Sequence, residues 1–158
     1  MSSIEEKILA KTDARSPLIS SLPRPLVFTN GCFDILHRGH VCYLEEAAQL
    51  GNSLLVAVNT DDSVRRQNKG TDRPINSLDD RLALLAALQS VDLVIPFDSD
   101  TPLELIQTIK PDVLVKGGDW PIEQIVGAQE ILQNGGEVHS IRFRYQRSTT
   151  DLINRIRS

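Results

Sequence analysis

Two of the three histidines in this chain, His37 and His40, stand three residues apart, with Gly39 between them. They follow an apolar segment typical of a buried strand and coincide with the start of a helical pattern. A helix N-terminus carries free backbone N–H groups that bind anions, and side chains three residues apart share one helix face. A glycine there lets a phosphate or a base approach the backbone closely. The pattern therefore predicts a phosphate site whose imidazoles stabilise charge that grows during phosphoryl-type transfer.

The same segment allows two other interpretations. Its histidines could be polar caps in a surface loop, or Cys32, His37, His40 and Cys42 could bind zinc. On the expected helix, His40 and Cys42 would point about 200° apart at ~3.6 residues per turn, which disfavours a shared tetrahedral centre. We therefore take phosphate binding as the main hypothesis and expect no protein-bound metal.

The elements that must position these residues alternate between strands and helices. Apolar runs predict strands at residues 26–29, 54–58, 93–95, 113–115 and 138–141. Helical spacing and capping signals predict helices over 39–50, from Ser77, from Pro102 with Thr101 as cap, over 122–133, and from Ser148 with Leu152, Ile153 and Ile156 inward. This order is typical of an α/β fold, a Rossmann-like, doubly wound parallel five-stranded sheet with helices on both faces.

Residues 1–25 are expected to form an N-terminal arm, and residues 26–158 to form the domain itself. Within the arm, a short helix is predicted over residues 4–11. Three prolines then interrupt regular structure: Pro17, Pro23 and Pro25.

Composition excludes several classes of protein. The 158 residues include 17 Lys and Arg against 21 Asp and Glu, an acidic balance that argues against a general nucleic-acid binder. The apolar run at residues 82–88 is far shorter than the ~20 residues of a membrane-spanning helix. The first residues lack the pattern of a secretory signal, and two cysteines make no disulfide framework. We therefore expect a cytoplasmic protein with no nucleic-acid or membrane partner.

Five segments carry a resemblance to a known family, and two of them are residues 58–64, Val-Asn-Thr-Asp-Asp-Ser-Val, and residues 73–76, Arg-Pro-Ile-Asn. Residues 29–40, with their His-x-Gly-His pattern, resemble the signature of the nucleotidyltransferase superfamily. Residues 111–119, Pro-Asp-Val-Leu-Val-Lys-Gly-Gly-Asp, and the Ser-Thr-Thr of residues 148–150 are more similar to bacterial heptose 1-phosphate adenylyltransferases. The resemblance covers residues 25–157.

The resemblance implies a reaction. A sugar 1-phosphate attacks the α-phosphorus of ATP, which Mg²⁺ accompanies, and pyrophosphate leaves. The product is ADP-heptose, a precursor of the lipopolysaccharide core. The family also implies a homodimer and a separate sugar kinase acting upstream. A cytidylyltransferase for a small alcohol phosphate such as glycerol 3-phosphate is an alternative, and so is a nucleotide- or zinc-binding module without catalysis.

The resemblance also implies site residues. His37 and His40 would stabilise the α-phosphate and the leaving group. The nucleotide would contact Asn30, Gly31, Cys32, Phe33, Gly39, Lys116, Gly117, Asp119, Ser148, Thr149 and Thr150.

Further candidates come from the residues themselves. Lys69 lies in a basic, glycine-containing loop and is predicted to reach the triphosphate as part of a flap, although such a loop could also be merely solvated. Arg81 lies in the first turn of a helix, where a cation opposes the helix dipole and a bound phosphate would explain it. The remaining substrate candidates are Asn59, Asp61 and Arg147, the last of which shares its role with Arg144 as an open alternative.

Overall fold

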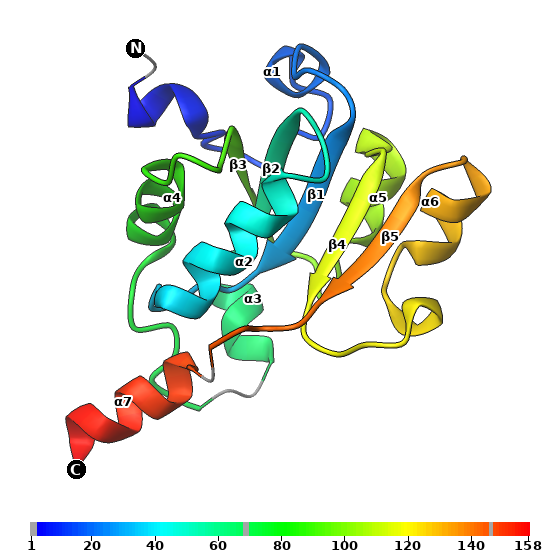
Figure 1. The fold of residues 1–158 in the computed structure, drawn as a ribbon. Helices are drawn as coiled ribbons and strands as arrows, with labels where there is room; N and C mark the ends of the chain where they lie inside the picture. The colour runs from blue at the N-terminus through cyan, green and yellow to red at the C-terminus, as the bar shows by residue number, and fades with distance from the viewer. Residues whose placement is uncertain (1–2, 68–69, 146) are drawn as a thin grey trace.

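A five-stranded parallel sheet forms the centre of the molecule in the computed structural model, which describes residues 3–67, 70–145 and 147–158 (Figure 1). Its strand order is β3-β2-β1-β4-β5, and every pair of neighbours is parallel. The strands are β1 (Leu26–Gly31), β2 (Ser53–Asn59), β3 (Leu93–Phe97), β4 (Val113–Gly117) and β5 (Glu137–Ile141). The order reverses between β1 and β4, and ligands of such sheets bind beyond the carboxyl ends of the strands at that point.

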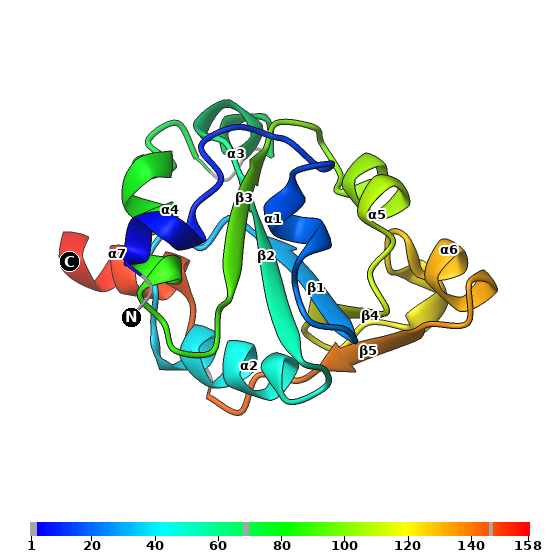
Figure 2. The same ribbon diagram turned by 90° about the horizontal axis from the view of Figure 1, so that it is seen from above.

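Helices cover both faces of this sheet. Figure 2 shows α2 (Arg38–Ala48) and α4 (Leu78–Ala86) on one side, and α1 (Pro17–Ser20), α5 (Leu103–Ile109) and α6 (Ala128–Gln133) on the other. The remaining helices are η1 (Ile4–Lys7), α3 (Asp61–Arg66), η2 (Ile122–Gln124) and α7 (Thr149–Arg157). The predicted α/β fold, a doubly wound sheet with two helical layers, is confirmed.

Alternation along the strands explains the two layers. In β2, Leu54, Val56 and Val58 pack in the cluster that α2 and α4 cover, while Leu55 and Ala57 pack in the cluster with α5 and α6. All five side chains are fully buried. Because successive side chains of a strand point to opposite faces, a strand covered on both faces must be apolar throughout.

Three predicted helices differ from the observed ones. The helix predicted over 122–133 is two elements, because Gly127 adopts φ 86° and separates η2 from α6. The α5 helix starts at Leu103 rather than Pro102, which stands at the N-cap with ψ 12°. In α7, Ile153 is buried as expected, but Ile156 is 79% exposed and does not point inward.

Two short helices were not predicted. Pro17 does not interrupt regular structure but begins α1, with the Ser16 hydroxyl capping the helix by accepting the Leu18 N–H. The α3 helix lies between the strand predicted at 54–58 and the helix predicted from Ser77, where no element is predicted, and Thr60 caps it by accepting the N–H of Ser63. Proline is well tolerated in a first helical turn, so a proline can begin a helix as well as end one.

The arm packs along the edge strand β3. Its expected helix over 4–11 ends at Lys7, because the backbone then extends and Leu9 donates its N–H to the carbonyl of Val94. Leu9 and Ile19 are buried in the same cluster as the strands. The described part of the arm therefore belongs to the same packed unit as the sheet. Among the described residues, no helix is long and apolar enough to cross a membrane.

Candidate active site

The turn from β1 into α2 is built around close packing of its own residues. Phe33 adopts φ 48°, in the left-handed region that L-residues seldom occupy. Its ring lies so close to Gly31 that a Cβ at that position would approach it to 2.9 Å, so a larger residue there would displace the ring. The same ring meets His40 edge-on, with centroids 5.4 Å apart. The strained turn thus supports one of the two histidines directly.

The two histidines form a stacked pair at the start of α2. Their ring centroids are 3.8 Å apart with planes inclined by 23°. The backbone N–H of His37 points at Nδ1 of His40, 3.4 Å away, which places the proton of a neutral His40 ring on Nε2. Gly39 makes room for the pair, because a Cβ there would lie 2.9 Å from Cε1 of His37. In the structure this glycine makes room for an imidazole, and its predicted contact with the nucleotide stays a prediction.

Burial favours the neutral form of His37. Removal from solvent is the main cause that lowers its pKa, and the positive charge of Arg147 lowers the pKa further. The Nδ1 atom of this ring is buried and has no hydrogen-bond partner in the described part of the chain. Both effects therefore favour the neutral ring over the charged one.

A cavity of about 390 Å³ opens beside these rings at the carboxyl ends of β1 and β4. It brings together twelve of the predicted site residues: Asn30, Gly31, Cys32, Phe33, His37, His40, Lys116, Gly117, Arg147, Ser148, Thr149 and Thr150. We call it the main cavity. Its position is the one expected from the reversal of strand order.

The N-terminus of α7 forms the wall that carries Ser148, Thr149 and Thr150. Ser148 caps the helix by accepting the N–H of Asp151 at 3.0 Å, as its sequence pattern predicted. Thr149 donates its hydroxyl to the carbonyl of Ile35 at 3.0 Å and so ties α7 to the turn before α2. Two helix N-termini therefore border one cavity, an arrangement that suits a polyanion.

Asp119 is not brought into the main cavity. It follows β4 and pairs with Arg142 at 3.2 Å, and both side chains are largely exposed. Lys116 and Gly117 do line the cavity, and the ammonium of Lys116 lies 5.7 Å from the centre of the Trp120 ring.

A second cavity of about 310 Å³ adjoins the first, and we call it the side cavity. The two share Asn30, Gly31, Cys32 and Lys116. Asn59 lines the side cavity, although its amide already donates to the hydroxyl of Ser63 at 2.9 Å. Asp61 lines neither of these two cavities, and its carboxylate pairs with Arg81 at 2.8 Å.

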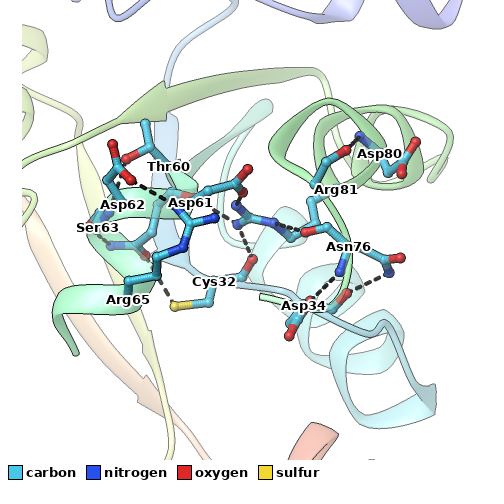
Figure 3. Close-up of polar contacts among 12 residues, drawn as sticks. Cys32, Asp34, Thr60, Asp61, Asp62, Ser63, Arg65, Asn76, Asp80 and Arg81 are labelled. Carbon is cyan, nitrogen blue, oxygen red and sulfur yellow. Dashed lines mark hydrogen bonds and ion pairs between the residues drawn. The ribbon is translucent and has the colours of Figure 1, made fainter. Parts of the chain in front are cut away.

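The prediction that Arg81 contacts a bound phosphate is wrong. Its side chain is fully buried, and Figure 3 shows it between the turn that holds Cys32 and the helix start at Asp61. The guanidinium donates to the carbonyls of Cys32 (2.8 Å), Asn59 (2.7 Å) and Asn76 (3.1 Å), besides its ion pair with Asp61. These four acceptors, and not a ligand, explain a cation in the first turn of α4. Arg81 is a positioning residue for the loops beneath the cavities.

Sequence reasoning assigned no role to Asp34 and Arg73, which also line the main cavity. Asp34 is buried and accepts hydrogen bonds from Nε of Arg73 (2.6 Å) and from the backbone N–H groups of Ile75 and Asn76 (2.9 Å each). Burial alone would raise the pKa of this carboxyl, but these hydrogen bonds and the charge of Arg73 outweigh burial and lower it. A carboxylate between the apolar residues Phe33 and Ile35 was the available signal, because a charge in such a place needs a partner.

Two expectations find no support in the described residues. Lys69 lies outside them, so its predicted approach to the triphosphate stays a prediction. The described residues contain no cluster of three or more His, Cys, Asp or Glu arranged to bind a metal, so the zinc alternative lacks a ligand set there. Cys32 instead directs its thiol to Asn59 and Gln67.

The profile of the cytidylyltransferase-like family matches residues 28–155. The chain belongs to this family. It is 54% identical to a D-β-D-heptose 1-phosphate adenylyltransferase of Bordetella bronchiseptica over 97% of the chain and 95% of that protein. It is also 60% identical to the bifunctional protein HldE of Haemophilus ducreyi over 84% of the chain, but this match spans only 28% of that longer protein.

Several solved structures share the architecture. A lipopolysaccharide core biosynthesis protein from Thermoplasma volcanium is 32% identical, with a TM-score of 0.61 over 77% of this chain and 98% of that chain. A pantothenate synthetase from Thermus thermophilus, 17% identical, reaches a TM-score of 0.54 over 85% of this chain and 61% of that one, which shows the fold alone.

Proposed function

We propose that this protein is a heptose 1-phosphate adenylyltransferase, which makes ADP-heptose and pyrophosphate from ATP and a heptose 1-phosphate. The observation that carries the substrate assignment is the 54% identity to the Bordetella enzyme across nearly the full length of both chains. The observation that supports the reaction class is the main cavity, where a stacked histidine pair faces the N-terminus of a second helix.

In the proposed reaction, a phosphate oxygen of the sugar attacks the α-phosphorus of ATP while the bond to the β-phosphate oxygen breaks. The nucleophile is already an anion, so no general base is needed. The protein has to position both substrates and stabilise charge on the leaving pyrophosphate. His40 would donate from Nε2, and the free N–H groups at the starts of α2 and α7 would hold phosphate oxygens.

Mg²⁺ would enter as a part of the substrate MgATP. Among the described residues that line the main cavity, Asp34 is the sole carboxylate, and its oxygens are engaged by Arg73, Ile75 and Asn76. Phosphate oxygens and water therefore suit the ion better than this protein's side chains do.

The proposal extends to the surroundings of the reaction. Since ATP is the nucleotide donor, we place the protein in the cytoplasm. A separate phosphoryl transfer must first make the sugar 1-phosphate. We also expect a homodimer, which light scattering after gel filtration would test.

Pyrophosphate release tests the function directly. The purified protein is incubated with ATP or CTP, each with heptose 1-phosphate or glycerol 3-phosphate. We expect turnover with ATP and heptose 1-phosphate. Turnover with CTP and glycerol phosphate alone would establish the alternative cytidylyltransferase. No turnover with any pair would support a non-catalytic binding module.

Variants of the histidine pair test the mechanism. His37→Ala and His40→Ala should each lower kcat by about 100-fold or more, the usual effect of losing one donor to a developing charge. The third histidine, His139, provides the matched control because it lies on β5 and pairs with Glu137 outside the main cavity. His139→Ala should retain full activity.

A further inference from the structure

Arg73 is a largely buried cation at the edge of the main cavity, which its side chain helps to line. Its side chain is only 7% exposed, and it is one of the residues that line the cavity. A cation buried to this extent is costly unless its donors are paired. The hydrogen-bond partners of its guanidinium nitrogens therefore indicate the role of Arg73.

One donor of Arg73 is held firmly. Nε donates to Asp34 at 2.6 Å, and Asp34 is itself fixed by the N–H groups of Ile75 and Asn76. The side-chain amide of Asn76 donates a hydrogen bond to the backbone carbonyl of Asp34 at 2.7 Å. The plane of the guanidinium is thereby set by a buried network and does not depend on solvent.

The two terminal nitrogens of Arg73 donate to no acceptor among the described residues. In the described part of the chain, only Nε of this guanidinium makes a hydrogen bond. The terminal nitrogens are the two that form forked hydrogen bonds to phosphate oxygens. They belong to a cavity that also holds the histidine pair and the start of α7.

We propose that Arg73 is a binding residue for the β- and γ-phosphates of the nucleotide, and that Asp34 positions it. The inference rests on the proposed function in that it takes ATP as the substrate. The pyrophosphate that leaves carries more charge than the same group in ATP, so a fixed guanidinium would stabilise it in the transition state and hold it as product. The sugar phosphate would not depend on Arg73.

Binding measurements separate this role from a structural one. Arg73→Gln keeps an N–H donor for Asp34 but removes the charge and the fork. By calorimetry, it should weaken the binding of ATP and of inorganic pyrophosphate at least tenfold while changing AMP affinity by less than twofold. Arg73→Lys keeps the charge without the fork, and should recover part of the affinity for pyrophosphate.

Arg24→Gln is the matched control. Arg24 also pairs with an aspartate, Asp112, but it lies half exposed and lines neither the main nor the side cavity. This variant should bind all three ligands as the wild type does. Thermal unfolding and circular dichroism establish that the variants are folded.

The outcomes also keep the two proposals apart. Unchanged ATP and pyrophosphate affinity in folded Arg73→Gln would overturn the inference, and so would an equal loss of AMP affinity. Heptose 1-phosphate is titrated in the same way. If Arg73→Gln lost affinity for this ligand alone, Arg73 would bind the other substrate and the inference would again be wrong. A wild type that binds ATP and pyrophosphate through Arg73 but does not adenylylate heptose phosphate would refute the proposed function alone.

Discussion

At the scale of single residues, Gly39 and His37 form a steric pair. A methyl group at Gly39 would lie 2.9 Å from Cε1 of His37 and push the ring out of its stack on His40. We predict that Gly39→Ala lowers kcat by about 100-fold, because a displacement of ~1 Å in a reacting group can cost that much. Thermal unfolding should change little, since a ring can move more easily than a backbone.

A double-mutant cycle checks this prediction. Once His37→Ala has removed the ring, adding Gly39→Ala should cost almost nothing more in kcat. Independent, additive losses would show that Gly39 acts through the backbone or the ligand and not through His37.

The charge of His37 gives a second prediction at this scale. Because burial and Arg147 both lower its pKa, the ring should titrate below about 6.5, the ordinary value for histidine. NMR titration of the free protein would show the midpoint. In Arg147→Gln the midpoint should rise but stay below the ordinary value, since burial is the larger cause. Arg24→Gln should leave it unchanged, and a midpoint above 6.5 in the wild type would contradict the prediction.

At the scale of elements, Asp34 joins the turn before α2 to the segment before α4. Asp34→Asn would leave Arg73 buried without a counter-charge, and losing one partner of a buried pair typically costs about 3–5 kcal/mol. Urea unfolding at pH 7 should show a loss of this order. The carboxylate has a lowered pKa in the folded state, so its contribution is complete above the ordinary pKa and disappears as pH falls through the folded value.

The difference between the wild type and Asp34→Asn should therefore narrow below about pH 4. Asp112→Asn is a suitable comparison because its ion pair with Arg24 is half exposed and should contribute about 1 kcal/mol or less. Equal losses in both variants, or a difference that does not depend on pH, would contradict the assignment.

Elements also show where sequence reasoning succeeds and where it stops. All five strands were predicted. In β1 to β4 the reason is a run of buried apolar residues, which can be read locally, whereas the edge strand β5 is only partly buried. The break at Gly127 and the start of α1 at Pro17 could not be read locally. Glycine occurs with positive or negative φ, and proline can begin a helix or end one. Most of the main cavity was predicted because its residues lie in the segments that resemble a known family, and two of those segments directly follow predicted strands.

Arg81 and Arg73 could not be assigned from local sequence. Both lie in or near helix α4. Arg81 has an acceptor for each of its three guanidinium nitrogens, whereas Arg73 donates to a single carboxylate. The acceptors of Arg81 come from three separate segments of the chain. Which arginine is structural and which faces the cavity is therefore a property of the tertiary fold.

At the scale of the whole molecule, the arm should unfold together with the sheet. Leu9 is buried in the core cluster and its N–H pairs with Val94 of the edge strand. We predict that Leu9→Ala lowers the free energy of unfolding by about 2–3 kcal/mol, the lower end of the range for a buried leucine. Ile4→Ala, at a side chain 44% exposed, should change it by about 0.5 kcal/mol or less.

Urea unfolding followed by fluorescence and by circular dichroism would check this. A single shared transition is expected for both variants. A separate early transition for Leu9→Ala, with the main transition unmoved, would show that the arm is an independent appendage.

The arm begins at the opposite end of the sheet from α7. Lys7 holds η1 there by donating to the carbonyls of Leu88 and Val91, just ahead of β3, whereas α7 extends from the carboxyl ends of the strands (Figure 1). A bead, a glass surface or a fluorescent protein joined ahead of Ile4 would thus lie at the end of the sheet opposite the main cavity and leave the cavity open. The same load joined behind Arg157 would lie at the end of the sheet that carries the main cavity, so tethered assays on this molecule are best anchored by its first residues.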